Sequence, residues 1–141
     1  MARKGAFVII CENDKILLVK RTDVPAWDLP GGGVWKDETE TDAAIRETNE
    51  ETGYHIKILY KIGEYLRPEV NDTQFIYQAV ICGGEEISKG DETAKLKWFE
   101  KTSLPLLMIP HRKRQIKDFF ASYKDIQITL KEPFIIKLFQ K

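Results

Sequence analysis

The stretch Gly32–Tyr54 reads GGVWKDETETDAAIRETNEETGY, and the fold of the chain is best predicted outward from it. It holds three glutamates, Glu47, Glu50 and Glu51, whose i, i+3 and i+4 spacing places them on one side of a helix. Like charges at this spacing repel by roughly 0.2–0.5 kcal/mol per pair. Gly53 is predicted to end the helix, which leaves the acids at the negative end of its dipole. We interpret this unfavourable placement as a mark of function.

A hard divalent cation would turn both penalties into attractions, because Mg²⁺ and Mn²⁺ prefer oxygen ligands. The three glutamates are therefore the predicted metal ligands. The alternative is a solvated helix face, which would be the better interpretation of an acidic helix end taken alone. Arg46 has the spacing of an ordinary surface ion pair with Glu50, an interpretation that is compatible with an active site.

The helix around these acids is expected to begin at about Thr39–Thr41. Its spacing puts Ala43 and Ala44 on the glutamate side, which is expected to be small and open. Ile45 falls on the other, modestly apolar side. Just before the helix, the three glycines Gly31–Gly33 permit a tight turn with exposed backbone, and we predict such a turn there.

The whole chain has 141 residues, which fits a single domain over residues 1–141. Its 22 basic residues balance 22 acidic ones, so no nucleic-acid polymer is expected as a partner. The apolar run Ala6–Cys11 is too short to cross a bilayer, and we expect a cytoplasmic protein without a membrane contact. Cys11 and Cys82 lie in apolar runs and are expected to be buried thiols.

Hydrophobic patterns predict the remaining elements. Lys4–Cys11 is almost continuously apolar, as in a strand covered on both faces. Further extended segments are expected at Lys15–Arg21, Trp27–Pro30, Ile56–Leu66, Thr73–Cys82 and Leu96–Phe99. Residues 125–141 are β-prone and are expected to add a C-terminal strand segment, either at a sheet edge or in a subunit contact.

A second helix is expected to start near Pro110. Its apolar stripe comprises Ile116, Phe119, Phe120 and Tyr123. The basic run His111–Arg114 is predicted to be a solvated helix start, with contact to a substrate phosphate as the alternative.

Written as a pattern, the opening stretch is Gly32-x5-Glu38-x7-Arg46-Glu47-x2-Glu50-Glu51-x-Gly53. This closely resembles the signature of the MutT/Nudix hydrolases, G-x5-E-x7-R-E-U-x-E-E-x-G-U, in which U is a bulky apolar residue. All seven fixed positions match, whereas Thr48 and Tyr54 stand at U positions. The resemblance implies an α/β fold, the Nudix-type α/β/α sandwich with a mixed β-sheet.

The resemblance also implies chemistry: hydrolysis of a nucleoside diphosphate linked to another moiety, by attack of water at phosphorus with Mg²⁺ or Mn²⁺. The carbonyl of Gly31, or alternatively that of Gly32, is then expected to join the three glutamates around the metal. The site would be supported by Gly32, Glu38, Arg46 and Gly53. The general base is expected to be Glu47 or Glu50, with Glu92 as the alternative.

Substrate choice depends on residues outside the motif. Phe75 and Tyr77 share a strand face and are candidates for stacking on a base, with core packing as the alternative. Asp91 is a further candidate contact. The compact chain favours a nucleoside triphosphate, oxidised or otherwise non-standard, as the small-molecule partner of a monomer or homodimer. The alternatives are an ADP-ribose or dinucleoside polyphosphate hydrolase, or a non-catalytic Nudix nucleotide sensor.

Overall fold

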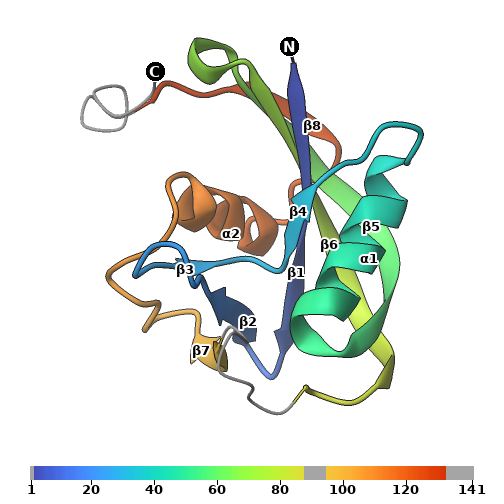
Figure 1. Ribbon diagram of the computed structural model, residues 1–141. Coiled ribbons are helices and arrows are strands. Elements are labelled where there is room, and N and C mark those ends of the chain that lie inside the picture. The colour runs from blue at the N-terminus through green and yellow to red at the C-terminus, as the bar shows by residue number, and fades with distance from the viewer. Residues whose placement is uncertain (1, 88–94, 133–141) are drawn as a thin grey trace.

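The computed structural model describes residues 2–87 and 95–132, which contain eight strands and two α-helices (Figure 1). The strands are β1 (Arg3–Glu12), β2 (Lys15–Lys20), β3 (Trp27–Asp28), β4 (Gly31–Gly33), β5 (Tyr54–Arg67), β6 (Asp72–Gly84), β7 (Lys95–Glu100) and β8 (Ile126–Thr129). The helices are α1 (Glu40–Thr52) and α2 (Arg112–Phe120), and a 3₁₀ turn covers Pro68–Val70.

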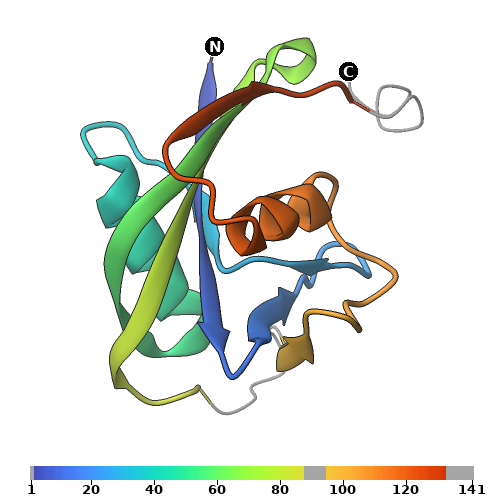
Figure 2. The ribbon, with the colours of Figure 1, turned by 180° about the vertical axis from the view of Figure 1, so that it is seen from behind.

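The strands form a mixed sheet in the order β3-β2-β1-β6-β5-β8, with β4 also paired to β1 and β7 to β2. β1 and β6 run parallel, as do β5 and β8, whereas β5 and β6 are antiparallel. The two helices lie on opposite sides of β1, β5 and β6 (Figures 1 and 2). The predicted α/β/α sandwich with a mixed sheet is confirmed.

β1 is covered on both faces because alternate side chains point to alternate helices. Ala6, Val8 and Ile10 join a buried cluster with Ala43 and Ala44 of α1. Phe7 and Ile9 join a second cluster, which includes Ile116 of α2. The uninterrupted apolar run of β1 is therefore explained as predicted.

The limits of α1 also agree with the prediction. The Thr39 hydroxyl accepts a hydrogen bond from the Asp42 N–H at 3.1 Å, which caps the first turn. Gly53 ends the helix in the left-handed conformation (φ 84°), and its N–H donates to the Asn49 carbonyl. A side chain at Gly53 would also clash, because its Cβ would lie 2.1 Å from the Glu85 carbonyl oxygen.

The buried face of α1 differs from the prediction. Ala43 and Ala44 are fully buried rather than open, together with Thr48 and Thr52. Ile45 is 36% exposed. The small side chains of Ala43 and Ala44 let the helix approach the sheet closely, so these two residues are covered by the sheet.

Gly31–Gly33 is a short strand rather than the predicted turn. It runs antiparallel to β1, with Gly31 opposite Phe7 and Gly33 opposite Gly5. A Cβ at Gly31 (φ 142°) would lie 2.2 Å from the Ala6 carbonyl oxygen. Glycine is thus required at position 31 by the close approach of β1 rather than by a turn.

The prediction of two buried thiols was wrong for Cys82, which is exposed, and Cys11 is only partly buried. The last pair between β1 and β6 is Ile10 with Ala79. Beyond it β6 pairs only with β5, so Cys82 lies on a part of the strand that β1 does not reach.

The C-terminal segment contributes β8, which pairs parallel with β5 at one edge of the sheet. Residues 133–141 of the predicted segment lie outside the described residues. Neither α1 nor α2, the helices of the described ranges, is long and apolar enough to cross a membrane.

Candidate active site

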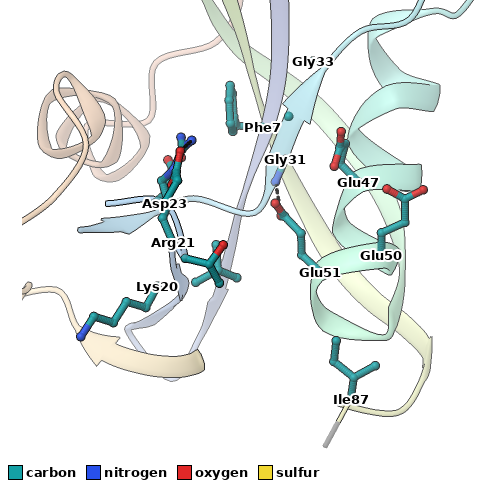
Figure 3. A pocket seen from close by; sticks show the side chains of 14 residues that line it. Phe7, Lys20, Arg21, Asp23, Gly31, Gly33, Glu47, Glu50, Glu51 and Ile87 are labelled. Carbon is teal, nitrogen blue, oxygen red and sulfur yellow. Dashed lines mark hydrogen bonds and ion pairs between the residues drawn. The ribbon is translucent and has the colours of Figure 1, made fainter. Parts of the chain in front are cut away.

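A cavity of about 730 Å³ lies where α1 faces the first four strands. Figure 3 shows Glu47, Glu50 and Glu51 projecting from α1 on one side, with Lys20, Arg21 and Asp23 on the other. The floor between these walls includes Phe7, Asp28 and the three glycines of β4. The fold therefore gathers all the predicted metal ligands at one cavity, opposite basic residues that the motif does not include.

Glu51 is the most deeply placed of the three acids. Its Oε1 accepts a hydrogen bond from the Gly31 N–H at 2.8 Å (Figure 3). Burial raises the pKa of Glu51 to about 8, and the charges of Glu47 and Asp28 act in the same direction. The contact of Gly31 with the acid is thus through its N–H, whereas the resemblance implied a role for its carbonyl.

Glu47 lies directly against the glycine strand. A Cβ at Gly32 would lie 2.6 Å from the Glu47 carboxyl carbon, so only glycine allows this approach. Burial also raises the pKa of Glu47. Glu50 is more open, with 55% of its side chain exposed, and lies 3.3 Å from Arg46 Nη1.

Arg46 ties the helix to the loop that precedes it. Its Nε and Nη2 donate to the two carboxylate oxygens of Glu38 at 2.8 and 3.0 Å. The same Nη2 donates to the Gly33 carbonyl at 3.1 Å, and the guanidinium lies 3.5 Å from the centre of the Trp35 ring. The hydrogen bonds from Arg46 hold the pKa of Glu38 below its ordinary value. This two-pronged pairing fixes β4 relative to α1.

Comparison with known proteins identifies the arrangement. A family model described as the NUDIX domain matches residues 1–120. The chain belongs to the Nudix family. It is a Nudix hydrolase, and proteins of this family act on the phosphoric anhydride bonds of nucleotides.

Individual relatives of this Nudix hydrolase are similar over most of their length. A Bacillus subtilis (strain 168) protein named "Putative 8-oxo-dGTP diphosphatase" is 50% identical over 94% of this chain and 89% of its own. A Methanocaldococcus jannaschii ADP-ribose pyrophosphatase is 36% identical over 79% of this chain and 69% of its own. In structure, a Nitrosomonas europaea NUDIX hydrolase superposes with a TM-score of 0.77 at 20% identity, over 93% of this chain and 80% of that one.

Nudix hydrolases generally use divalent cations, and the donor set of this site suits one. Three carboxylates share one wall, and burial together with the neighbouring carboxylates raises the pKa values of Glu47 and Glu51, so a cation there would favour their ionised forms. Within residues 2–87 and 95–132, however, no three acidic, histidine or cysteine side chains converge closely enough to grip an ion. Glu50 points instead toward Arg46.

The residues predicted to contact the substrate do not lie at the cavity where the structure describes them. Phe75 and Tyr77 pack in the cluster beneath α1, with Tyr77 only 6% exposed, and neither lines the cavity. The structure therefore favours the core-packing alternative for both. The candidates Asp91 and Glu92 fall outside the described residues.

Sequence reasoning missed Arg21, Asp28 and Arg112. Arg112 was predicted to be solvated, but it is 2% exposed, and its Nε donates to Asp28 Oδ1 at 2.5 Å. The prediction failed because the two residues are 84 positions apart, so no local pattern relates them. The sole local signal was an aspartate in the otherwise apolar segment between Trp27 and Leu29.

Proposed function

We propose that this protein is a metal-dependent pyrophosphohydrolase of nucleoside triphosphates, and that an oxidised guanine nucleotide such as 8-oxo-dGTP is the first substrate to test. The observation that carries the proposal is the two-walled cavity, which Glu47, Glu50 and Glu51 line on one side and Arg21 and Lys20 line on the other. The choice of nucleotide draws on the Bacillus subtilis relative, whose name carries that activity and which is 50% identical to this chain.

A polyphosphate suits such a cavity because the two walls can bind its negative charge in different ways. Arg21 and Lys20 can donate charge-assisted hydrogen bonds to phosphate oxygens. The carboxylates repel the same phosphates unless a cation lies between them, so this wall is where Mg²⁺ or Mn²⁺ would be held, by Glu47, Glu50 and Glu51. When bound, the cation would neutralise the diphosphate and lower the pKa of a water molecule.

The remaining roles belong to the residues around that wall. Glu47 or Glu50 is the proposed general base, with Glu92 as the alternative. Gly31 and Gly32 bring the β4 backbone against the acids, and Arg46 with Glu38 keeps that backbone fixed relative to α1. Since phosphoryl transfer depends mainly on positioning and charge stabilisation, this rigid acidic wall supplies its principal needs.

The substitution Glu50→Gln tests the proposal. It removes a charge but little volume from the acidic wall, and kcat should fall a hundredfold or more, or about 3 kcal/mol in barrier. The matched control is Asp42→Asn, which neutralises an exposed acid in the first turn of the same helix and should leave kcat within about twofold. Release of pyrophosphate from 8-oxo-dGTP and dGTP, with Mg²⁺ or Mn²⁺, is the measurement. Full activity of Glu50→Gln would disprove the assigned role.

A second candidate is ADP-ribose, favoured by the 36% identity to the Methanocaldococcus jannaschii relative. Hydrolysis of ADP-ribose would give AMP and ribose 5-phosphate, and hydrolysis of a dinucleoside polyphosphate would give two mononucleotides, so neither releases pyrophosphate. Chromatographic separation of the nucleotide products therefore compares all of these substrates by kcat/KM. A nucleotide sensor would bind a ligand from this panel tightly and release no product with either metal.

A further inference from the structure

The guanidinium of Arg112 is buried on the α2 side of the sheet, yet two of its contacts are with residues that line the cavity. Its Nε donates to Asp28 Oδ1, and its Nη1 donates to the side-chain oxygens of Gln74 and Gln115 at 2.8 and 3.0 Å. Its guanidinium carbon lies 3.9 Å from the centre of the Phe7 ring. Of these partners, Asp28 and Phe7 line the cavity.

Asp28 in turn stands between two arginines. Its Oδ1 is occupied by Arg112 and by the Leu29 N–H at 2.7 Å. Its Oδ2 lies 3.6 Å from Arg21 Nη1, a distance beyond a hydrogen bond. The Asp28 side chain is 6% exposed, whereas that of Arg21 is 41% exposed and lines the cavity.

A buried carboxylate requires a close cation, because an unpaired charge in a protein interior costs several kcal/mol. Arg112 meets this requirement for Asp28. Arg21 is consequently held at the rim by Asp23, to whose two carboxylate oxygens its Nε and Nη2 donate at 2.7 and 2.5 Å, while its Nη1 makes only a long ion pair with Asp28. Without Arg112, Arg21 would be the nearest described cation left, and a shift of less than 1 Å would bring its Nη1 into hydrogen-bond distance of Asp28.

We propose that Arg112 is a positioning residue for substrate binding: by pairing with Asp28 it leaves Nη1 of Arg21 available to contact the phosphates of the substrate. This inference rests on the proposed function, since it assumes that Arg21 contacts phosphate. Through Arg112, helix α2 would position the basic wall of the cavity, although α2 carries none of the Nudix motif.

A double-mutant cycle between Arg21 and Arg112 tests this coupling. Arg21→Met should raise KM for a nucleoside triphosphate by about tenfold, the worth of one charge-assisted hydrogen bond. Arg112→Met should raise KM by a similar factor with a smaller change in kcat, because it withdraws Arg21 from the substrate. The variant carrying both substitutions should show no further rise. Independent, multiplied effects of the two substitutions would overturn the proposal.

A third variant separates positioning from a merely structural role. Asp28→Asn in the Arg112→Met background leaves no unpaired buried charge, so Arg21 is not recruited and KM should return to within about threefold of the wild-type value. This variant also carries the test if Arg112→Met alone does not fold. If the variant that carries both Asp28→Asn and Arg112→Met folds and its KM stays tenfold above the wild-type value, the proposal is contradicted.

The matched control is Arg114→Met, the same chemical change two positions along α2. The Arg114 side chain is 45% exposed and pairs with Asp118 rather than with a cavity residue, so its removal should leave KM unchanged. Binding of a non-hydrolysable imidotriphosphate, measured by calorimetry in the same variants, gives a readout without turnover. If the wild-type protein binds this analogue but hydrolyses no nucleotide, the proposed function fails while the Arg112 cycle can still be read from the dissociation constants.

Discussion

The two faces of the sheet treat charge in opposite ways. On the α1 face, three glutamates share one wall, and the pKa values of Glu47 and Glu51 are raised by burial, with neighbouring carboxylates acting in the same direction. On the α2 face, Arg112 is buried with a hydrogen-bond partner for each of the donors described above. The charged forms of Glu47 and Glu51 are therefore disfavoured on the α1 face, where a ligand is expected to bind. On the α2 face, the charge of Arg112 is paired within the protein, where the wall of the cavity must be rigid.

The strongest test of this contrast is the stability of Arg112→Met. The substitution removes the buried partner of Asp28, whose side chain is 6% exposed, and breaking this buried pair should cost about 3–5 kcal/mol of unfolding free energy even though the more exposed Arg21 moves toward Asp28. Urea denaturation followed by circular dichroism measures it. Arg114→Met on the same helix should cost no more than about 1 kcal/mol, since the Arg114 side chain is 45% exposed and its partner Asp118 keeps a hydrogen bond from the Tyr65 hydroxyl at 2.7 Å. Equal losses in the two variants would mean that the α2 network is no more tightly matched than a surface pair.

This contrast also explains how much of the molecule could be predicted from sequence. The acidic wall lies within one contiguous segment, so the spacing of Glu47, Glu50 and Glu51 and the stop at Gly53 were sufficient to predict its helix. The alternation of apolar residues likewise predicted β1 and β6, because a strand's period is local.

The other half of the cavity was not predictable in this way. Arg112 meets Asp28 across 84 residues and Gln74 across 38, so their pairing follows from the sheet topology rather than from any pattern. The same limit applies to Phe75 and Tyr77, whose strand face was recognised but whose neighbour, α1, was not. The prediction of a turn at Gly31–Gly33 was wrong because this segment pairs with β1, which crowds Gly31 and lies elsewhere in the sequence.

The pH dependence of stability sharpens the contrast on the α1 face. Without metal, the pKa of Glu51 is about 8 in the folded protein and near 4.5 in the unfolded chain. Between these values the folded state keeps a proton that the unfolded state has released, so stability falls as pH rises. The slope contributed by this group is as much as about 1.4 kcal/mol per pH unit, and it vanishes above pH 8.

Comparison with Glu51→Gln isolates this contribution, because other titrating groups are common to both proteins. Unfolding free energies measured in a chelator from pH 5 to pH 9 should converge toward low pH and diverge toward high pH, with the glutamine variant the more stable. Millimolar Mg²⁺ should flatten the wild-type slope, since a cation held by the ionised acid favours loss of the proton. Parallel curves in the chelator would show that the charge of Glu51 is already balanced within the protein.

The smallest expected effect concerns Thr48, which stands where the family pattern has a bulky apolar residue. Among the residues that the structure describes, its Oγ1 is the one buried side-chain polar atom without a hydrogen-bond partner. Thr48→Val keeps the shape and removes the hydroxyl, so it should stabilise the protein by about 1 kcal/mol.

Thr52→Val, one turn later and equally buried, is the matched control. The Thr52 hydroxyl donates to the Thr48 carbonyl at 2.6 Å and accepts from the Tyr54 N–H at 3.0 Å, so its loss should cost about 1–2 kcal/mol. Thermal melts of the two variants should therefore shift in opposite directions, and a shift in the same direction would mean that the hydroxyl of Thr48 is not unmatched after all.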